Sequence, residues 1–289
     1  MTQTMTSTAA ELAEYARQIR VQILKAVYVA RAGHIGGPLS AADMLSVLYF
    51  GVMDIDPENP TDPDRDRFVL SKGHSSIALY ATLALRGYFP VDELKTFDSV
   101  DSRLQGHPDQ TVTPGVDMSS GSLGLGFAGA LGIALGARAA GKDFTTYVML
   151  GDGECNEGVV WEGAHVAARY GLDNIIALID HNKLQQFGWT GASLDERISP
   201  YLGDQLANRW RAFDWKVIEV DGHDVAAILG AVDEAKTIEG MPVAIVAHTV
   251  KGKGVSFMEN QPGWHSKVPT DQELADALRE LGEPEGGAQ

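Results

Sequence analysis

The sequence predicts an α/β fold, a doubly wound parallel sheet with helices on both faces. Continuous apolar segments of strand length alternate with stretches whose apolar residues have helical spacing, and Gly-Asp-Gly directly follows one of these segments. Apolar strands that alternate with helices are typical of a parallel sheet covered on both sides. No repeat, linker or low-complexity block interrupts residues 1–289, so we expect a single domain.

The first part of the chain predicts two helices, a strand and a third helix. Residues 8–31 carry apolar side chains at spacings of three and four, which predicts an amphipathic helix. A turn rich in Gly and Pro follows at 33–38, and Ser40 is placed to cap a second helix. Residues 67–71 predict a short buried strand that leads into a helix at 75–86.

The rest of the chain continues this alternation. Glycines are frequent between 106 and 136, and we expect tight packing of a helix as their cause. The predicted strands are 145–150, 174–180, 215–220 and 242–249, and the predicted helices are 157–170 and 225–237. The polar residues 284–289 are expected to fray.

Composition excludes several classes of protein. With 39 acidic and 23 basic residues, the formal net charge is −16, which disfavours binding to nucleic acid. No apolar run approaches the roughly 18 to 20 residues that cross a bilayer, and residues 1–10 do not form a signal peptide. The single cysteine, Cys155, cannot form an internal disulfide. We therefore expect a soluble cytoplasmic protein that binds neither nucleic acid nor membrane.

Two polar residues predict a cation site at one edge of the sheet. Asp152, in Gly151-Asp152-Gly153, follows the strand at 145–150, and Asn182 stands about one βαβ unit, roughly 30 residues, further on. Ligands bind outside the carboxyl ends of parallel strands, and neighbouring strands lie roughly 4.8 Å apart. A carboxylate and an amide oxygen can then converge on Mg²⁺, whose octahedron is completed by water and phosphate oxygens.

A simpler interpretation of Gly-Asp-Gly is a tight turn whose Asp caps the next helix, and the motif alone does not separate the two. The partner Asn182 at the expected spacing favours the cation site. The first strand-helix turn lacks a dinucleotide fingerprint, and the sequence contains no Walker-type Gly-Lys-Ser/Thr motif. Both observations disfavour nicotinamide cofactors and P-loop chemistry.

The motifs together resemble the transketolase family, whose members bind thiamine diphosphate. The matching segments are 33–39, 68–74, 106–108, 121–124, 151–163, 221–224, 251–254 and 264–265, together with Asn182. The resemblance implies that Asp152, Asn182 and the backbone carbonyl of Leu184 hold Mg²⁺ on the cofactor diphosphate. It also implies cofactor contacts for His74, Gly121, Leu123, Gly153 and His265.

The same resemblance assigns catalytic roles to loop histidines. His34 and His107 are expected to contact substrate hydroxyls and transfer protons, and His265 is expected to assist at the diphosphate, because imidazole does both near neutral pH. A structural hydrogen bond is the ordinary alternative for any one of these histidines. Glu157 is expected to join an acidic network across a subunit interface, although a carboxylate at a helix N-terminus is also stabilising locally.

Other conspicuous residues receive structural interpretations. We expect no catalytic or ligand role for a further set: His165, His181, His223, His248 and Cys155. His223 is expected to stabilise its turn. Phe187 and Trp189 either reshape the sugar channel or pack at an interface, and the second interpretation is favoured. Ile35 replaces the proline usual in the family, so the resemblance does not identify the donor and acceptor sugars.

The resemblance also implies that a second domain of the enzyme is supplied by another protein. The glutamate that activates thiamine diphosphate in this family belongs to a pyrimidine-binding domain, for which this sequence has no room. We therefore predict a split transketolase in which a second subunit supplies that domain and an α2β2 heterotetramer forms. It would transfer a two-carbon ketol unit from a ketose, expected to be phosphorylated, to an aldose. The alternatives are the α subunit of a 2-oxo acid dehydrogenase and a non-catalytic cofactor-binding subunit.

Overall fold

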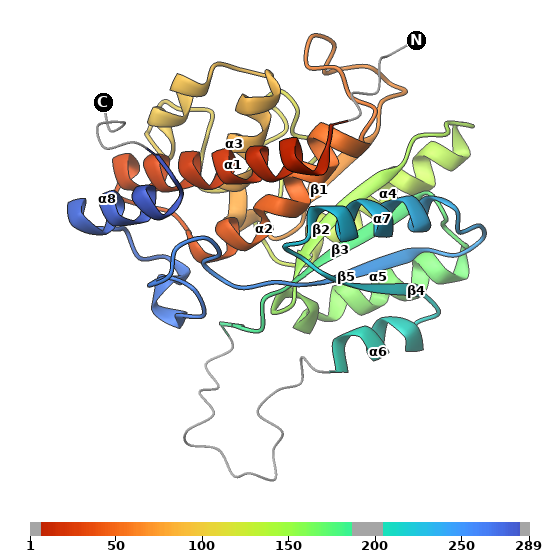
Figure 1. The fold of residues 1–289 in the computed structure, drawn as a ribbon. Coiled ribbons are helices and arrows are strands. Elements are labelled where there is room, and N and C mark those ends of the chain that lie inside the picture. The colour runs from red at the N-terminus through yellow and green to blue at the C-terminus, as the bar shows by residue number, and fades with distance from the viewer. Residues whose placement is uncertain (1–6, 187–204, 284–289) are drawn as a thin grey trace.

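A parallel sheet organises the chain. The computed structural model describes residues 7–186 and 205–283. Its five strands are ordered β1-β2-β3-β5-β4 (Figure 1). They are β1 Arg67–Leu70, β2 Thr146–Gly151, β3 Ile175–His181, β4 Lys216–Asp221 and β5 Val243–His248. All neighbouring strands are parallel, as predicted, and β4 lies at one edge.

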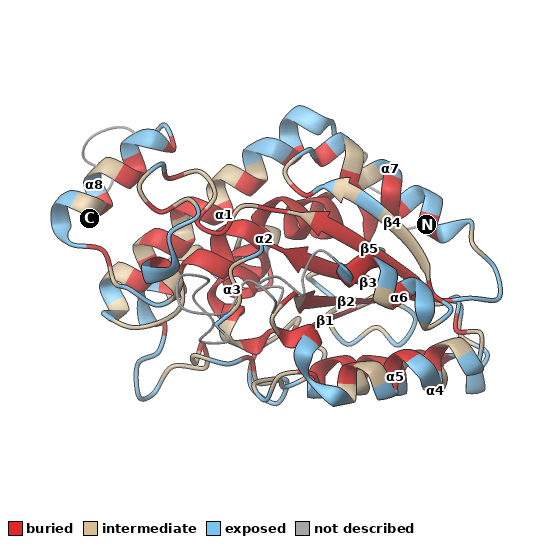
Figure 2. Ribbon diagram, turned by 90° about the horizontal axis from the view of Figure 1, so that it is seen from below, coloured by how far each residue is buried: buried red, intermediate tan, exposed pale blue. Residues whose placement is uncertain are grey.

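The strands divide the core into two apolar clusters. Every residue of β3 is buried, and β2 and β5 are buried except at their last residue. Successive side chains point to opposite faces of a sheet. On β2, Tyr147 and Met149 therefore join one cluster, and Val148 and Leu150 join the other. Figure 2 shows the buried strands between layers of helices, of which α4, α5 and α7 have exposed outer sides, whereas α2 is buried along its whole length.

Helices cover both faces of the sheet, which confirms the predicted doubly wound α/β architecture. One face carries α1 Ala9–Ala30, α2 Gly36–Val47, α3 Ser76–Arg86 and α7 Val225–Lys236. The other face carries α4 Leu125–Ala139, α5 Gly158–Arg169 and α6 Leu206–Ala212. Helix α8 Asp271–Glu280 packs against α1, away from the strands (Figure 1). Within the described ranges, no helix has the length and apolar character needed to cross a membrane.

Helix α1 begins where the sequence predicted. Thr8 accepts a hydrogen bond from the backbone of Glu11, and the Glu11 carboxylate accepts one from the backbone of Thr8. This reciprocal capping box fixes the start of the helix. The short helices α6 and α8 were not predicted, because each buries only three residues and has no extended apolar pattern.

The prediction that Ser40 caps the second helix was wrong. Helix α2 begins at Gly36, inside the segment predicted as a turn, and Ser40 is buried in its interior. The Ser40 hydroxyl donates to the Asp180 carboxylate on β3 at 2.7 Å. A serine that satisfies a buried carboxylate is compatible with a helix interior, where its preference for a cap does not apply.

The predicted tight packing of the glycine-rich helix is correct for only part of α4. A Cβ on Gly126 would lie 2.6 Å from the Cα of Ser71, and one on Gly129 would collide with Met118. At Gly132 and Gly136 an added Cβ would meet nothing within 4 Å, and both residues are exposed. Packing within this chain therefore accounts for the first two glycines and not for the last two.

Candidate functional site

The candidate residues gather in one pocket of about 590 Å³ at the carboxyl ends of the central strands. Those that line it are His34, His74, His107, Leu123, Asp152, Gly153, Glu157, Asn182, Leu184 and His265. Gly121 lies behind the lining, where a Cβ would be 3.2 Å from the ring of His107. The pocket is thus where ligands are expected in an open parallel sheet.

Asp152 stands at the end of β2 with its carboxylate fixed by backbone donors. One oxygen accepts from the Gly153 amide at 2.7 Å, and the other accepts from the Lys183 amide at 2.7 Å. The second bond ties Asp152 to the loop that carries Asn182. Burial, together with the nearby charge of Asp180, raises the pKa of Asp152 to about 6. A bound cation would favour the ionised form of this carboxylate.

Asn182 follows β3, the neighbour of β2 in the sheet, as the cation-site prediction required. Its amide nitrogen donates to the Asp180 carboxylate at 3.2 Å. Its amide oxygen accepts from the Leu184 amide at 3.2 Å and keeps a second lone pair for a cation. The Leu184 carbonyl accepts from the Lys251 ammonium at 2.9 Å and likewise has a further lone pair.

A buried ion pair lies beneath these oxygens. Asp180 has no exposed surface and pairs with the Lys72 ammonium, which also donates to the Gly37 carbonyl at 3.1 Å. Thr249 donates to the other Asp180 oxygen. Although burial acts in the opposite direction, the charge of Lys72 holds the pKa of Asp180 below its ordinary value. This fixed carboxylate orients the Asn182 amide, since only an NH₂ group can face it.

Three histidines form the opposite wall. The rings of His34 and His74 lie 4.9 Å apart between centroids, as do those of His34 and His265. Ile35 donates to the His265 carbonyl at 3.1 Å, which joins the two loops. The side-chain nitrogen Nδ1 of His265 is buried and has no hydrogen-bond partner in the described ranges. His107 lies on the same pocket.

His34, His74 and His265 are held neutral. Burial, followed by the charge of Lys72, lowers the pKa of His74 to about 2, and burial with Lys251 lowers that of His265 to about 4. Burial also lowers the pKa of His34, with His107 and Lys251 contributing. Neutral imidazoles can donate one hydrogen bond and accept another, so the wall can bind phosphate oxygens or sugar hydroxyls.

Two glutamates near the motif differ in their surroundings. Glu154 is 2% exposed, and its carboxylate accepts from the amides of Gly124 at 2.8 Å and Gly151 at 3.0 Å and from the Ser71 hydroxyl. It thereby joins the loops after β1 and β2 to the start of α4. Glu157 lies on the exposed pocket rim, directly before α5, and caps no backbone amide with its side chain. Its position at the N-terminus of α5 is also the one that the local alternative requires, where a carboxylate stabilises the helix through its charge.

The remaining conspicuous residues are placed as follows. His165 is exposed on α5, and His248 at the end of β5 pairs with Glu219. His181 is buried beside His248. Burial raises the pKa of the Cys155 thiol well above its ordinary value, in agreement with an unreactive cysteine. Phe187, Trp189 and the end of the chain from 284 lie outside the described residues.

His223 does more than the predicted stabilisation of its turn. Its backbone amide donates to Asp221 at 2.9 Å within that turn. Its ring, however, leaves the turn and contacts Asp43 on α2 and the backbone after β5. The prediction was incomplete because a turn motif carries no information about which distant element the side chain reaches.

The residues present fit a divalent metal and a diphosphate. The Asp152 carboxylate, the Asn182 amide oxygen and the Leu184 carbonyl are hard oxygen donors of the kind that Mg²⁺ binds. Three side chains supply donors for an anion beside them: His265, whose Nδ1 has no partner among the described residues, the neutral His74 and the buried Lys251. The pocket can therefore bind a metal-bound diphosphate.

Sequence reasoning assigned no role to Asp180, Lys72, Lys251 or Glu154. Asp180 could have been found as a charged residue that ends an apolar strand, where a buried partner is required. Lys72 immediately follows the strand at 67–71 and could have been named as that partner. The contact between Lys251 and Leu184 spans 67 residues, and no local pattern predicts it.

Comparison with known proteins gives a family model that matches most of the chain. Residues 12–285 match the family described as "Transketolase, thiamine diphosphate binding domain". The chain is 43% identical over 276 residues to the 6-deoxy-6-sulfo-D-fructose transketolase subunit SqwG of Clostridium sp. strain MSTE9, covering 96% of this chain and 98% of that protein. It is 40% identical to one of the apulose-4-phosphate transketolase subunits of Phocaeicola vulgatus, covering 91% of each.

Longer proteins match over a part of their length. A transketolase from Leishmania mexicana superposes with a TM-score of 0.85 at 34% identity, covering 94% of this chain and 41% of that one. Transketolase 2 of Escherichia coli is 37% identical and is covered over 41% of its length. The chain thus spans about two fifths of these longer proteins and nearly the full length of the proteins named as subunits.

Proposed function

Since this chain belongs to the transketolase family, we propose that it is the diphosphate-binding subunit of a split transketolase. With a second subunit, it transfers a two-carbon ketol unit from a ketose to an aldose. The single observation that carries this proposal is the pocket itself. Asp152, Asn182 and the Leu184 carbonyl line one side, and neutral histidines line the other.

The metal and the diphosphate are held by the inner part of the pocket. Asp152, Asn182 and Leu184 bind Mg²⁺ through oxygen atoms. His74, His265 and the Gly153 amide donate to the diphosphate, while Leu123 and Gly121 lie beside the cofactor. Asp180, paired with Lys72, accepts from the Asn182 amide nitrogen and so would leave the Asn182 oxygen for the metal.

The outer histidines act on the sugars. Thiamine diphosphate, when bound, supplies the carbanion and the electron sink for carbon–carbon bond cleavage and formation. His34 and His107 bind the substrate hydroxyls and hold or receive their protons. A neutral imidazole can accept such a proton, and burial keeps His34 in that form.

A pyrimidine-domain partner completes the site. Gly132 and Gly136 leave a bare strip on the exposed side of α4, and the Glu157 carboxylate on the pocket rim has no hydrogen bond to another residue that the structure describes. Glycine in a helix interior costs about 1 kcal/mol relative to alanine, so exposed helix glycines are explained by close approach of another backbone. The partner covers this strip, Glu157 joins its acidic groups, and two such pairs form an α2β2 assembly.

The donor substrate is a ketose that carries an anionic group. The relatives named above are named for 6-deoxy-6-sulfo-D-fructose and for apulose 4-phosphate, one a sulfonate and the other a phosphate. The pocket itself is lined by His, Lys and amide groups that suit polyhydroxylated, anionic ligands. A cytoplasmic location is proposed on the ground that the sequence contains one cysteine, Cys155, and so cannot form an internal disulfide.

Reconstitution tests the proposed function. This chain is co-expressed with a candidate partner that carries the pyrimidine domain, and ketol transfer is assayed with thiamine diphosphate, Mg²⁺ and a panel of ketose phosphates and sulfoketoses. We expect activity that requires both proteins, and His107→Ala should lower kcat more than cofactor affinity. His165→Ala, on the exposed side of α5, is the matched control. Activity of the chain alone, or activity with 2-oxo acids in place of ketoses, would overturn the proposal.

A further inference from the structure

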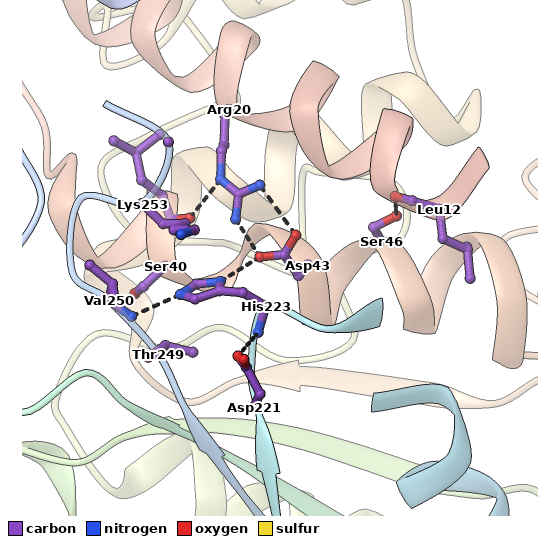
Figure 3. Close-up of polar contacts among 12 residues, drawn as sticks. Leu12, Arg20, Ser40, Asp43, Ser46, Asp221, His223, Thr249, Val250 and Lys253 are labelled. Carbon is purple, nitrogen blue, oxygen red and sulfur yellow. Dashed lines mark hydrogen bonds and ion pairs between the residues drawn. The ribbon is translucent and has the colours of Figure 1, made fainter. Parts of the chain in front are cut away.

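A largely buried polar cluster links the first two helices to the loop after β4 (Figure 3). Its members Arg20, Asp43 and His223 do not line the pocket. Arg20 on α1 forms an ion pair with Asp43 on α2 and donates to the Leu39 carbonyl at 3.2 Å. The Asp43 carboxylate also contacts Nδ1 of His223 at 2.7 Å. The side chains of Arg20, Asp43 and His223 are 9%, 7% and 12% exposed, so the cluster is largely shielded from solvent.

The hydrogen bonds of His223 fix its tautomer. The backbone amide of Val250 donates to Nε2 at 2.8 Å, so Nε2 carries no hydrogen. The ring hydrogen is then on Nδ1, which donates to Asp43. His223 therefore spans the distance between a carboxylate on α2 and a backbone amide after β5, and Figure 3 shows its ring between them.

The amide held by His223 lies in a segment that reaches the pocket. Thr249, just before Val250, donates its hydroxyl to Asp180. Lys251, just after it, donates to the Leu184 carbonyl, and the Gly252 amide donates to the Gly36 carbonyl at 3.0 Å. The Thr249 amide also donates to the His181 carbonyl at 3.2 Å. Between the backbone bonds of Thr249 and Gly252, the Val250 amide is held by a side chain, Nε2 of His223.

Stability alone is a poor reason for such a cluster. Taking Arg20 and Asp43 out of water costs several kcal/mol per ion, which a well-packed apolar replacement avoids. His223 lies in the loop that follows β4. This strand is at the edge of the sheet and all its residues are at least partly exposed, so packing alone holds the loop after it weakly. Nε2 of His223 is a hydrogen-bond acceptor whose direction is fixed by Asp43, and it instead determines where residues 249–252 lie.

We propose that His223 is a positioning residue for the diphosphate site. Held by Asp43 and Arg20, its Nε2 fixes the Val250 amide and thereby keeps Thr249 against Asp180 and Lys251 against the Leu184 carbonyl. This inference rests on the proposed function, since it concerns the same site. It assigns no contact between His223 and cofactor or substrate.

Three variants of the full chain test the inference. His223→Ala removes the acceptor, and His223→Gln restores an amide oxygen that can accept from Val250. Asp224→Ala is the control, because Asp224 is next to His223 but only caps α7 through the amides of Ala226 and Ala227. Hydrogen exchange at the Val250 amide and calorimetric affinity for thiamine diphosphate with Mg²⁺ are measured for each.

We expect exchange at Val250 to become at least about tenfold faster in His223→Ala and affinity to fall about tenfold, the equivalent of one buried hydrogen bond. His223→Gln should recover most of both losses, whereas Asp224→Ala should lower the unfolding midpoint and change neither. Unchanged exchange in His223→Ala, an equal loss of affinity in Asp224→Ala, or no recovery in His223→Gln would each overturn the inference. If the unmodified chain binds no cofactor, the proposed function fails, while exchange at Val250 still decides whether His223 anchors the segment.

Discussion

The inner wall and the outer rim of the pocket are built in different ways. The inner wall, formed by Lys72, Asp152, Glu154, Asp180 and Asn182, is buried, and each of its polar side chains has partners within this chain. The outer rim comprises Glu157 at the edge of the pocket and the neighbouring exposed side of α4, which does not line the pocket. On that side of α4 lie Leu125, which is 52% exposed, Gly132 and Gly136. The chain thus completes the inner wall, which faces a metal and an anion, and leaves the outer rim exposed.

This difference indicates which part of the site each of the two proposed subunits forms. Buried charges are stable only when they are paired, so a diphosphate site made of Asp, Lys and His must be finished within one folded chain. A rim of glycine and exposed apolar and acidic groups is completed by association. Apart from His265→Asn and the controls, each variant described below changes a residue of either the inner wall or the outer rim.

Loss of the Asp152 carboxylate should have the largest effect. Asp152→Asn keeps the size of the side chain and removes its charge, so affinity for thiamine diphosphate with Mg²⁺ should fall at least about a hundredfold, since even residues that only support a metal ligand are worth roughly 10 to 100-fold. Calorimetry on the purified chain measures it. Asp173→Asn, on a residue before β3 at the opposite end of the sheet, should bind as the unmodified chain does. Equal affinity in both variants would remove Asp152 from the site.

The two glutamates give the most direct contrast in stability. Glu154→Ala leaves the Gly124 and Gly151 amides without their acceptor and should lower the free energy of unfolding by about 3 kcal/mol. Glu157→Ala removes an exposed side chain and should change it by less than about 0.5 kcal/mol. Denaturant titration of the two variants compares them. A loss of similar size in both would contradict the division into wall and rim.

The half-buried His74 and His265 should make the stability of the chain sensitive to acid. Their folded-state pKa values, about 2 for His74 and about 4 for His265, lie below the ordinary 6.5, so the unfolded chain binds more protons between these values. Stability should therefore be complete above about pH 6.5 and fall as the pH drops toward about 4. His265→Asn should lose less than the unmodified chain between these limits, as measured by thermal unfolding. An equal loss would show that His265 does not cause the effect.

The smallest effect is expected on the rim. Gly136→Ala should raise the free energy of unfolding of the chain alone by about 0.5 to 1 kcal/mol, because the added methyl group meets nothing and helix propensity improves. In the same variant, affinity for the partner should fall. Gly126→Ala is the matched control on the same helix and should be destabilising, because its Cβ would lie 2.6 Å from the Ser71 Cα. Unimpaired assembly of Gly136→Ala would show that the partner does not approach this strip.

Much of the fold could be predicted from the sequence because it is encoded locally. Apolar segments identified all five strands, since parallel strands buried on both faces have a continuous pattern. The start of α2 was missed, because Ser40 has the preferences of a cap and its buried partner Asp180 lies 140 residues away. The two short helices were missed because they bury few residues.

For the site, short motifs predicted the residues that line the pocket, and the structure brings them together. Their supports could not be predicted in the same way. The pair of Lys72 and Asp180 spans 108 residues, and the contact between His223 and Asp43 spans 180. Such contacts depend on how the helices pack on the sheet, which a single sequence does not state. The acid network expected at Glu157 and the roles of individual histidines stay predictions.

The central claim is that the loop ends of β2 and β3 hold a metal against a diphosphate. Crystals of the chain grown with thiamine diphosphate and Mn²⁺, an octahedral oxygen-binding ion like Mg²⁺, allow the metal to be located by anomalous scattering. We predict a single strong peak within roughly 2.0 to 2.2 Å of oxygen atoms of Asp152, Asn182 and Leu184. A peak elsewhere, for example beside the exposed carboxylates of Asp54 and Asp64, with none between β2 and β3, would contradict the account.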